Sequence, residues 1–379
     1  MKKFKVSFIG FIDYANCMTE YSKGINRYSE NYESKIICHH PHSFNYETPH
    51  DYDLYKIAPS GNGWVRKENT IKEAINWVKE SSHIIIAEER KPNRLPLTLP
   101  IKDATTLSLQ TIVEIFSNTL KIDIVRDTQA GQNNNLHLFH PGSIYRNQPQ
   151  LFNQIGDKCF NKIIYGLDLF RFSPKDNRVN NKHLVFYPIS DKNFDKKEIL
   201  TSIDEKFDTE EMTILHIPSS KHLKGTTPII NNVNKVINQL NKKGPIHYKL
   251  VVPPKLIPFS EVIELKKKSH IYIDQFNQWG GIGVSAIESL MLGNLTFSTT
   301  QFDTIESIRA ANKNLNCGDD FYFIHLGVTH EEFINTLDFY LRKPITEIKE
   351  ITKKGVEWYY KVLTHQAISH KFEKEIFDS

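Results

Sequence analysis

Short apolar runs alternate with amphipathic stretches along the whole chain. Six of these runs in the first half are rich in β-branched and aromatic residues, which favours strands. They cover residues 4–9, 35–38, 83–87, 136–139, 162–165 and 183–187. Between them, apolar residues recur at intervals of three and four at 16–28, 70–80 and 107–120, which is the period of an amphipathic helix. The alternation predicts an α/β architecture with mostly parallel sheets.

A second series of the same kind begins near residue 213. Strands are predicted at 213–217, 247–252, 270–274 and 295–298, and helices at about 227–240, after Pro258 and at about 283–292. The short runs of Ile, Val and Phe in this series suit strands that are buried on both faces. Residues 190–211 are polar and charged, so we interpret them as the connection between two lobes. A long amphipathic stretch at 356–377 predicts a terminal helix.

The chain has 379 residues, which is more than one hydrophobic core usually organises. Two domains are therefore expected, and two lobes imply a cleft. The composition, 39% hydrophobic and 24% charged, is that of an ordinary globular protein and excludes collagen-like, disordered and membrane-embedded classes. The net charge of +4 is too small over this length for a protein that coats nucleic acid, although it leaves a local basic patch open.

The N-terminal residues and the cysteines bear on the compartment. The apolar run after the first lysines breaks at Asp13, so it predicts a first strand rather than a signal peptide. No segment approaches the ~20 apolar residues that span a bilayer, so any membrane contact would be peripheral. The four cysteines are scattered, without the spacing of a zinc site or a disulfide framework. We therefore expect a cytoplasmic protein in a reducing environment.

The most informative segment follows a predicted strand and reads DQFNQWGGIGVSAIESLMLGN from Asp274 onward. Its glycines let the backbone approach a ligand, and the helix that begins near Gly283 presents unpaired N–H groups and the positive end of its dipole, which suits a phosphate. Gly281, Ser285 and Glu288 fall on one face of this helix. Glu288 is thereby placed to accept hydrogen bonds from ribose hydroxyls. The alternative is a plain strand-to-helix turn with a solvated Glu288, and the spacing does not decide between them.

A second loop of this kind, HIPSSKHLKGT, also lies between a predicted strand and a predicted helix. Its residues Ser219, Lys221, Lys224 and Gly225 suit a cradle for a pyrophosphate, with the ammonium groups acting as point charges. No arginine occurs in residues 179–308, so phosphate recognition in this half depends on lysine. Loop lysines are more often simply solvated. Two such loops at the carboxyl ends of parallel strands, however, point to the crevice where α/β sheets bind ligands.

The first half offers two weaker candidates. His140 stands at the end of a predicted strand in HPGSIYR, together with Arg146. It could hydrogen-bond a sugar hydroxyl, whereas the usual case for such a histidine is a buried turn residue. Asp13 and Asn16 follow the first strand and precede a helix, so their loop is expected to face the cleft. The alternative is that one of them caps the helix.

Taken in order, these motifs resemble the retaining, nucleotide-sugar-dependent glycosyltransferases of the GT-B fold, in particular the family 4-like group. The likeness is carried by HIPSSKHLKGT, the DQ strand end, AIESLMLGN, HPGSIYR, DYANCMTEYSKGIN and THQAISHKFEKEIFD. It implies two Rossmann-like domains that face a cleft. These would be an acceptor-binding domain at 1–195 and a nucleotide-sugar-binding domain at 205–355, with a C-terminal helix at 356–379 that packs back on the N-terminal domain.

The resemblance also implies roles for matching residues. Glu288 matches the second glutamate of the family's E-x7-E motif, which holds the nucleotide ribose. Lys221 and Lys224 match the basic pair on the diphosphate, and His140 matches the histidine near the transferred sugar, so Lys224 and His140 are the expected catalytic residues.

One position departs from the family's pattern. Gly280 stands where the first glutamate of that motif is expected, so the contact to the sugar hydroxyls must come from elsewhere. Asp274, Gln275 and the backbone of residues 281–282 are the candidates.

The implied reaction is the transfer of a sugar, with retention and without a metal or other cofactor, from a UDP- or GDP-sugar to an acceptor. The breadth of the family makes a surface glycan or glycolipid the first expectation for the acceptor. Charged first-half loops at 64–67 and 88–94 could instead meet an anionic membrane surface, or nucleic acid as the less favoured option. The alternatives are a sugar-nucleotide epimerase of the same fold, a transferase that acts on nucleic acid and, outside enzymes, a two-lobed sugar-binding protein.

Overall fold

The computed structural model describes most of the chain in separate stretches. They are residues 2–10, 13, 16–38, 50–60, 64–87, 135–139, 162–166, 182–185, 187, 189, 194–242, 244–255, 257–276, 282–300 and 322–378. The chain divides into two compact units: Met1–Pro188 with His365–Ser379, and Ile189–Thr364.

The first unit contains a parallel sheet of seven strands among the described residues, in the spatial order β3-β2-β1-β6-β7-β8-β9. The strands are β1 (Phe4–Gly10), β2 (Tyr32–Cys38), β3 (Tyr52–Asp53), β6 (Ser81–Ala87), β7 (Leu136–Phe139), β8 (Lys162–Gly166) and β9 (Lys182–Val185). The six strands predicted in this half are confirmed, with ends that differ by up to three residues. A short antiparallel hairpin, β4 (Tyr55–Ile57) and β5 (Trp64–Arg66), lies outside this sheet.

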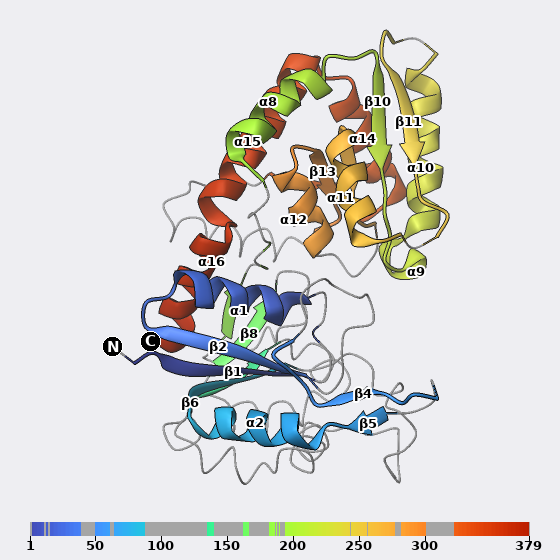
Figure 1. Cartoon of the computed structure of the whole chain (residues 1–379). Coiled ribbons are helices and arrows are strands. Elements are labelled where there is room, and N and C mark those ends of the chain that lie inside the picture. The colour runs from blue at the N-terminus through green and yellow to red at the C-terminus, as the bar shows by residue number, and fades with distance from the viewer. Residues whose placement is uncertain are drawn as a thin grey trace. The chain divides into compact units, whose positions relative to one another are not determined.

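Helices cover both faces of the first sheet. Helices α1 (Cys17–Tyr28) and α16 (His365–Phe372) lie on one face and α2 (Glu68–Lys79) on the other (Figure 1). The rings of Tyr21 on α1 and Phe372 on α16 have centroids 4.6 Å apart. Lys162 donates to the backbone oxygens of Glu375 and Ile376 at 2.8 and 2.9 Å, which ties the last turn, η4 (Glu373–Phe377), to this unit. The helix predicted at 107–120 lies outside the described residues.

The second unit contains a sheet of five parallel strands within the ranges that the structure describes. Their spatial order is β11-β10-β12-β13-β14, with β10 (Glu211–Leu215), β11 (His247–Val251), β12 (Ile271–Ile273), β13 (Leu295–Ser298) and β14 (Ile324–His325). Numbered within the unit, this order is 2-1-3-4-5. The order reverses between β10 and β12, and an α/β sheet binds its ligands outside the carboxyl ends of the strands at such a point.

Three helices were predicted in this unit, at about 227–240, after Pro258 and at about 283–292, and all three are confirmed, whereas those at 196–206, 221–224 and 330–341 were not predicted. The helices of the unit are α8 (Lys196–Lys206), α9 (Lys221–Lys224), α10 (Thr226–Leu240), α11 (Phe259–Lys268), α12 (Val284–Met291), α14 (His330–Leu341) and α15 (Ile345–Val362). The apolar faces of α8, α10, α14 and α15 and residues of the strands form one core, which includes Ile203, Val233, Ile273, Phe297 and Leu337.

The interpretation of 190–211 as a plain connection is wrong. Helix α8 lies within this stretch and begins where the Asp195 carboxylate accepts a hydrogen bond from the backbone N–H of Glu198 at 2.9 Å. Ile199, Ile203 and Phe207 are spaced four residues apart on one face and are buried in the core of the second unit. The second unit therefore begins at Ile189 rather than at 205, and the first unit's opening segment ends at 188 rather than 195.

The single terminal helix expected at 356–379 is also wrong in its boundaries. Helix α15 ends at Val362 and belongs to the second unit, because Val356, Tyr359 and Val362 bury their side chains there. The first unit takes up the chain again at His365, with α16 and η4. No helix in the described parts of either unit is both long and apolar enough to cross a lipid bilayer.

Candidate functional site

The candidate site lies in the second unit, where the loops after β10 and β12 leave neighbouring strands. β10 ends at Leu215 and pairs in parallel with β12, which ends at Ile273. The carboxyl ends of the two strands therefore point to the same edge of the sheet, at the point where the strand order reverses. The loop after β10 carries Lys224, and the loop after β12 begins with Asp274.

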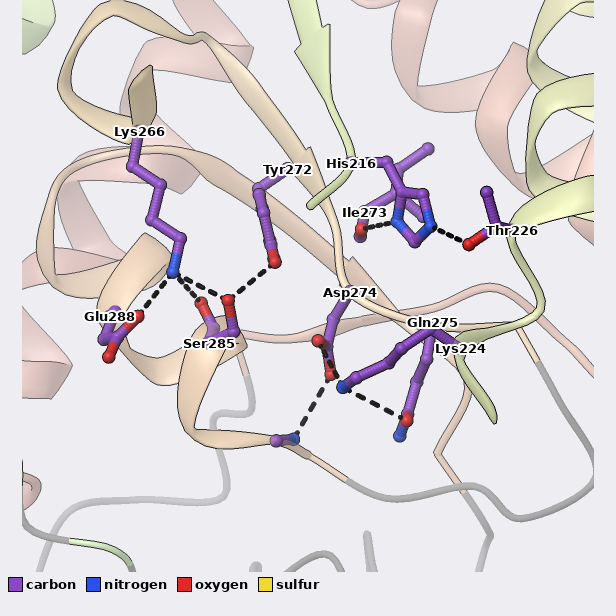
Figure 2. A network of polar contacts seen from close by, with 11 residues as sticks. His216, Lys224, Thr226, Lys266, Tyr272, Ile273, Asp274, Gln275, Ser285 and Glu288 are labelled. Atoms are coloured by element: carbon purple, nitrogen blue, oxygen red, sulfur yellow. Dashed lines mark hydrogen bonds and ion pairs between the residues drawn. The ribbon is translucent and has the colours of Figure 1, made fainter. Parts of the chain in front are cut away.

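Lys224 and Asp274 form the centre of the site (Figure 2), together with the backbone N–H of Gly283. The Lys224 Nζ lies 2.7 Å from Asp274 Oδ1 and 3.4 Å from Gln275 Oε1. The other carboxylate oxygen of Asp274, Oδ2, accepts the backbone N–H of Gly283 at 3.3 Å, directly before α12. Asp274 has no exposed surface, whereas the Lys224 side chain keeps 16% of its surface exposed. A buried carboxylate thus joins the ammonium group to the N-terminus of α12.

Local sequence explains why Lys224 reaches this position. Ser220 caps the single turn of α9, and Gly225 ends that turn with a left-handed backbone angle φ of 67°. A Cβ at Gly225 would lie 1.9 Å from the backbone oxygen of Phe276, so no other residue fits there. The N–H of Phe276 in turn donates to the backbone oxygen of Lys224 at 3.0 Å. The backbones of the two loops therefore contact each other directly.

The N-terminus of α12 approaches the lysine closely because residue 283 is glycine. A Cβ there would lie 2.9 Å from Lys224 Nζ and 3.1 Å from Asp274 Oδ2. Among the described residues, the backbone N–H groups of Val284 and Ser285 find no hydrogen-bond partner. Free N–H groups at the positive end of a helix, beside an ammonium group, favour an anion.

A second cluster of polar side chains surrounds the first turns of α12. Lys266 of α11 is fully buried, and its Nζ lies 2.6 Å from Glu288 Oε2. It also donates to the backbone oxygen and the Oγ of Ser285 at 2.9 and 2.8 Å. The Tyr272 hydroxyl lies 2.7 Å from the same Oγ (Figure 2). Glu288 is only 7% exposed, so the alternative of a solvated glutamate is wrong.

Burial sets the protonation of this cluster. Desolvation lowers the pKa of Lys266, and the neighbouring Glu288 carboxylate works against that shift. Burial also raises the pKa of Tyr272 well above its ordinary value, with the charge of Asp274 adding to the effect. Tyr272 is therefore a neutral phenol that donates or accepts a hydrogen bond.

His216, a buried residue directly after β10, connects the loop after β12 to the loop before α10. Its Nδ1 donates to the backbone oxygen of Ile273 at 2.8 Å, so its Nε2 is left to accept from the Thr226 hydroxyl at 2.9 Å. Burial lowers the pKa of this histidine, which keeps it neutral. It joins the end of β12 to the start of α10, and both of its nitrogens are used in doing so.

The structure brings together five of the predicted donor-site residues: Lys224, Gly225, Asp274, Gln275 and Gly283. Ser285 and Glu288 join them through α12 and Lys266. Their roles toward a nucleotide stay predictions.

Other predicted residues lie apart from this group. Lys221 is exposed and donates to the backbone oxygen of Pro254 at 3.3 Å, and Ser219 is exposed. Gly281, His140 and Arg146 lie outside the described residues.

Asp13 and Asn16 lie at the start of α1 in the first unit. The Asp13 carboxylate is buried and accepts the backbone N–H groups of Met18 and Thr19, each at 2.8 Å. Burial raises the pKa of Asp13, and these hydrogen bonds oppose the rise. Asn16 has a left-handed φ of 60°, and its side chain makes no cap bond. The capping alternative therefore holds for Asp13 and not for Asn16.

Three residues of the site escaped the sequence analysis: His216, Lys266 and Tyr272. His216 is the first residue of the HIPSSKHLKGT motif and directly follows an apolar strand, which is the signal that could have identified it. Lys266 is the first of three consecutive lysines, which as a group are typical of an exposed helix end. Only the position of Lys266 three residues after the buried Ile263 separates it from its neighbours.

No metal centre emerges from the described residues: none of their His, Cys, Asp and Glu side chains form a group of three or more that could hold an ion. Asp51 and Asp53 have the Asp-x-Asp spacing, but both are used locally. Asp51 accepts the backbone N–H of Ile36 at 2.9 Å, and Asp53 lies 2.7 Å from His50 Nδ1. Metal independence stays a prediction.

Comparison with known proteins identifies the fold. No protein-family profile matches the chain, and no curated protein matches it by sequence. Among solved structures it is similar to HepE from Anabaena in complex with UDP and glucose, with a TM-score of 0.53 at 8% identity, covering 99% of this chain and 100% of that one. It is also similar to a UDP-forming α,α-trehalose-phosphate synthase from Burkholderia vietnamiensis, with a TM-score of 0.53 at 8% identity over 100% and 98% of the two chains. The trehalose-6-phosphate synthase OtsA gives a TM-score of 0.52 at 10% identity over 99% of each. The chain therefore has the GT-B glycosyltransferase fold, with two Rossmann-like domains.

Proposed function

We propose that the protein is a glycosyltransferase that moves a sugar from a nucleoside-diphosphate sugar to an acceptor. One observation carries the proposal: the Lys224 ammonium and the N-terminus of α12 meet at the strand-order reversal of the second sheet. A diphosphate fits this place because it needs positive charge and backbone donors together. In this proposal the second unit binds the donor and the first unit binds the acceptor.

Lys224 keeps donor capacity for such a ligand. Its ammonium has three N–H bonds, and among the described residues Asp274 and Gln275 are the acceptors that it contacts. The group is partly exposed, so a phosphate oxygen can reach it. As the bond to the sugar breaks, negative charge grows on the leaving diphosphate. A preoriented donor at that position is worth about 3 kcal/mol in the transition state.

Asp274 has a supporting task in this reaction. With no exposed surface and both oxygens engaged, it holds Lys224 against α12 and is not placed to contact a sugar hydroxyl. Gln275, 8% exposed, is then the better candidate for the contact that the glutamate missing at Gly280 would have made. Glu288 is proposed to accept hydrogen bonds from the ribose, and His140 to act near the transferred sugar.

The stereochemistry, the cofactor requirement and the acceptor are also matters of proposal. We propose retention of the anomeric configuration, no metal or other cofactor, and a glycan or glycolipid acceptor reached from the cytoplasm, with at most peripheral membrane contact. Nucleic acid is the less favoured acceptor, in keeping with the small net charge of +4. UDP-sugars are the first donors to test, since HepE binds UDP and the Burkholderia vietnamiensis enzyme is UDP-forming.

The test is a thermal-shift and calorimetry panel of UDP-, GDP- and ADP-sugars on the wild-type protein. A ligand that binds only the folded state raises the melting temperature. Lys224→Met is expected to abolish the shift, whereas Lys249→Met, which removes an exposed lysine of β11 that pairs with Glu211, serves as the control and is expected to keep it. No shift with any nucleotide sugar, or an unchanged shift in Lys224→Met, would overturn the proposal.

Product analysis separates the proposed reaction from its competitors. A transferase consumes the donor in the presence of acceptor, and the anomeric configuration of the product, read by NMR, decides retention. An epimerase changes the sugar nucleotide with no acceptor present. A sugar-binding protein binds free sugar in the calorimeter and ignores nucleoside diphosphates.

A further inference from the structure

Lys266 is a buried cation that the proposed chemistry does not use directly. It has no exposed surface, and its three N–H bonds are matched by three acceptors: Glu288 Oε2, the Ser285 backbone oxygen and Ser285 Oγ. Its ammonium also lies 5.0 Å from the centre of the Tyr272 ring. With every donor engaged inside the protein, Lys266 has none left for a ligand.

Stability alone is a weak reason for this ion pair. Desolvating two charges costs free energy that their attraction often fails to offset, and apolar replacements of buried pairs are often neutral or stabilising. The other end of α12 provides a contrast. There, Lys206 of α8 donates to the backbone oxygen of Gly293 at 2.7 Å and to Asn294 Oδ1 at 3.0 Å. Lys206 thus satisfies the end of α12 with neutral acceptors, whereas Lys266 is paired with a carboxylate near the proposed ligand.

The geometry leaves one oxygen of Glu288 available. Lys266 contacts Oε2, and within the described residues no hydrogen bond reaches Oε1. With Oε2 paired to the lysine, Oε1 is the oxygen left to accept a hydrogen bond, and it needs a partner that donates. A vicinal diol of a ribose offers two hydroxyl donors, and a 2′-deoxyribose lacks one of them.

We propose that Lys266 is a positioning residue that holds Glu288 in a fixed orientation as an acceptor for the ribose hydroxyls, so that the site selects ribonucleoside over 2′-deoxyribonucleoside diphosphates. This inference rests on the proposed function, because it places a nucleoside diphosphate at α12. Lys266 acts on the ligand only through Glu288.

The experiment compares dissociation constants for UDP and 2′-deoxy-UDP by calorimetry, with the GDP and ADP pairs used in the same way if the wild-type protein prefers those bases. A hydrogen bond to a charged group makes the wild-type protein bind UDP about tenfold or more tightly than 2′-deoxy-UDP. In Lys266→Met, Glu288 loses its counter-charge, and the ratio is expected to fall to within about twofold. If Lys266→Met does not fold, Lys266→Gln, which keeps a neutral donor, is assayed for the same fall in the ratio.

The matched control is Lys206→Met, which removes the part-buried lysine of α8 that contacts the C-terminal end of α12 and does not touch Glu288. It is expected to lower the melting temperature and keep the wild-type ratio. A folded Lys266 variant with the wild-type ratio would overturn the inference, as would a wild-type protein that binds both nucleotides equally. A wild-type protein that binds no nucleoside diphosphate would instead refute the proposed function, so the two failures are distinguishable.

Discussion

The ion pair between Lys224 and Asp274 supports a prediction about stability and turnover together. Lys224→Met removes the ammonium but keeps most of the side-chain stem, and it leaves the Asp274 carboxylate buried, with the Gly283 N–H as its remaining donor among the described residues. Breaking a buried pair costs about 3 kcal/mol at the lower end of the usual range, and the lower end applies because Lys224 is 16% exposed. For a unit of this size, that corresponds to about 6 to 12 °C in melting temperature.

The double variant separates the two roles of the lysine. Lys224→Met with Asp274→Asn removes the uncompensated charge, so most of the lost stability should return, with a coupling free energy of about 2 kcal/mol. Turnover should not return, because the diphosphate still lacks its cation; a loss of about a hundredfold or more is expected in both variants. The assays are chemical denaturation for all four members of the cycle and release of nucleoside diphosphate from the donor found by thermal shift.

Two results would refute this reasoning. If turnover recovers together with stability in the double variant, Lys224 only neutralises Asp274 and does not contact the donor. If Lys224→Met unfolds at the wild-type denaturant concentration, the carboxylate is not held as the distances indicate.

Three further predictions test other parts of the site. Gly283→Ala places a Cβ 2.9 Å from Lys224 Nζ, so nucleotide binding should weaken about tenfold in calorimetry. The fold should persist, because the φ of −75° at this position suits alanine. Unchanged affinity would show that nucleotide binding does not require the lysine at this position. Gly225→Ala should destabilise the second unit by about 2 kcal/mol or more, since it combines a left-handed φ of 67° with a clash against Phe276; wild-type denaturation would contradict the close backbone contact. Burial lowers the pKa of His270 from 6.5 to about 4, so the folded state binds a proton at this histidine less readily than the unfolded state does. The contribution of His270 to the free energy of unfolding is therefore fully present above about pH 6.5 and is lost as the pH falls toward 4. His270→Gln should flatten that decline in denaturation curves taken from pH 7 to 4, and an equal decline in both proteins would exclude His270 as its source.

The alternation of strands and helices was predictable because both sheets are parallel and buried. Runs such as residues 271–273 and 295–298 are short, rich in apolar and β-branched residues and buried on both faces, and such runs are visible in the sequence without tertiary information. Helix α8 was not predictable in this way, because its few buried residues, Ile199 and Ile203, lie among charged residues that face outward. The end of α15 was missed because periodicity continues through residues 356–377, and only the core on which each turn packs distinguishes its two halves.

The candidate site shows the same division between local and tertiary information. Loops with glycine and lysine after two strands predicted Lys224, Asp274 and Gly283 as neighbours, because parallel strands bring their carboxyl ends to one edge. The pairing of Lys266 with Glu288 was not predictable, since it depends on how α11 is rotated about its axis, and adjacent lysines look alike in the sequence. The ionic partner of Lys224 followed from the fold and not from any spacing in the chain, since Asp274 lies 50 residues away.

The chain order of the two units has a consequence for biosynthesis. The second unit is one continuous stretch, Ile189–Thr364, whereas the first unit is interrupted by it and resumes at His365. A ribosome therefore releases every residue of the second unit before it releases α16, whose Phe372 packs against Tyr21. The second unit can complete its core during translation, but the first unit lacks α16, which covers one face of its sheet together with α1, until the end of translation. The unit whose synthesis begins first is thus the one whose chain is completed last.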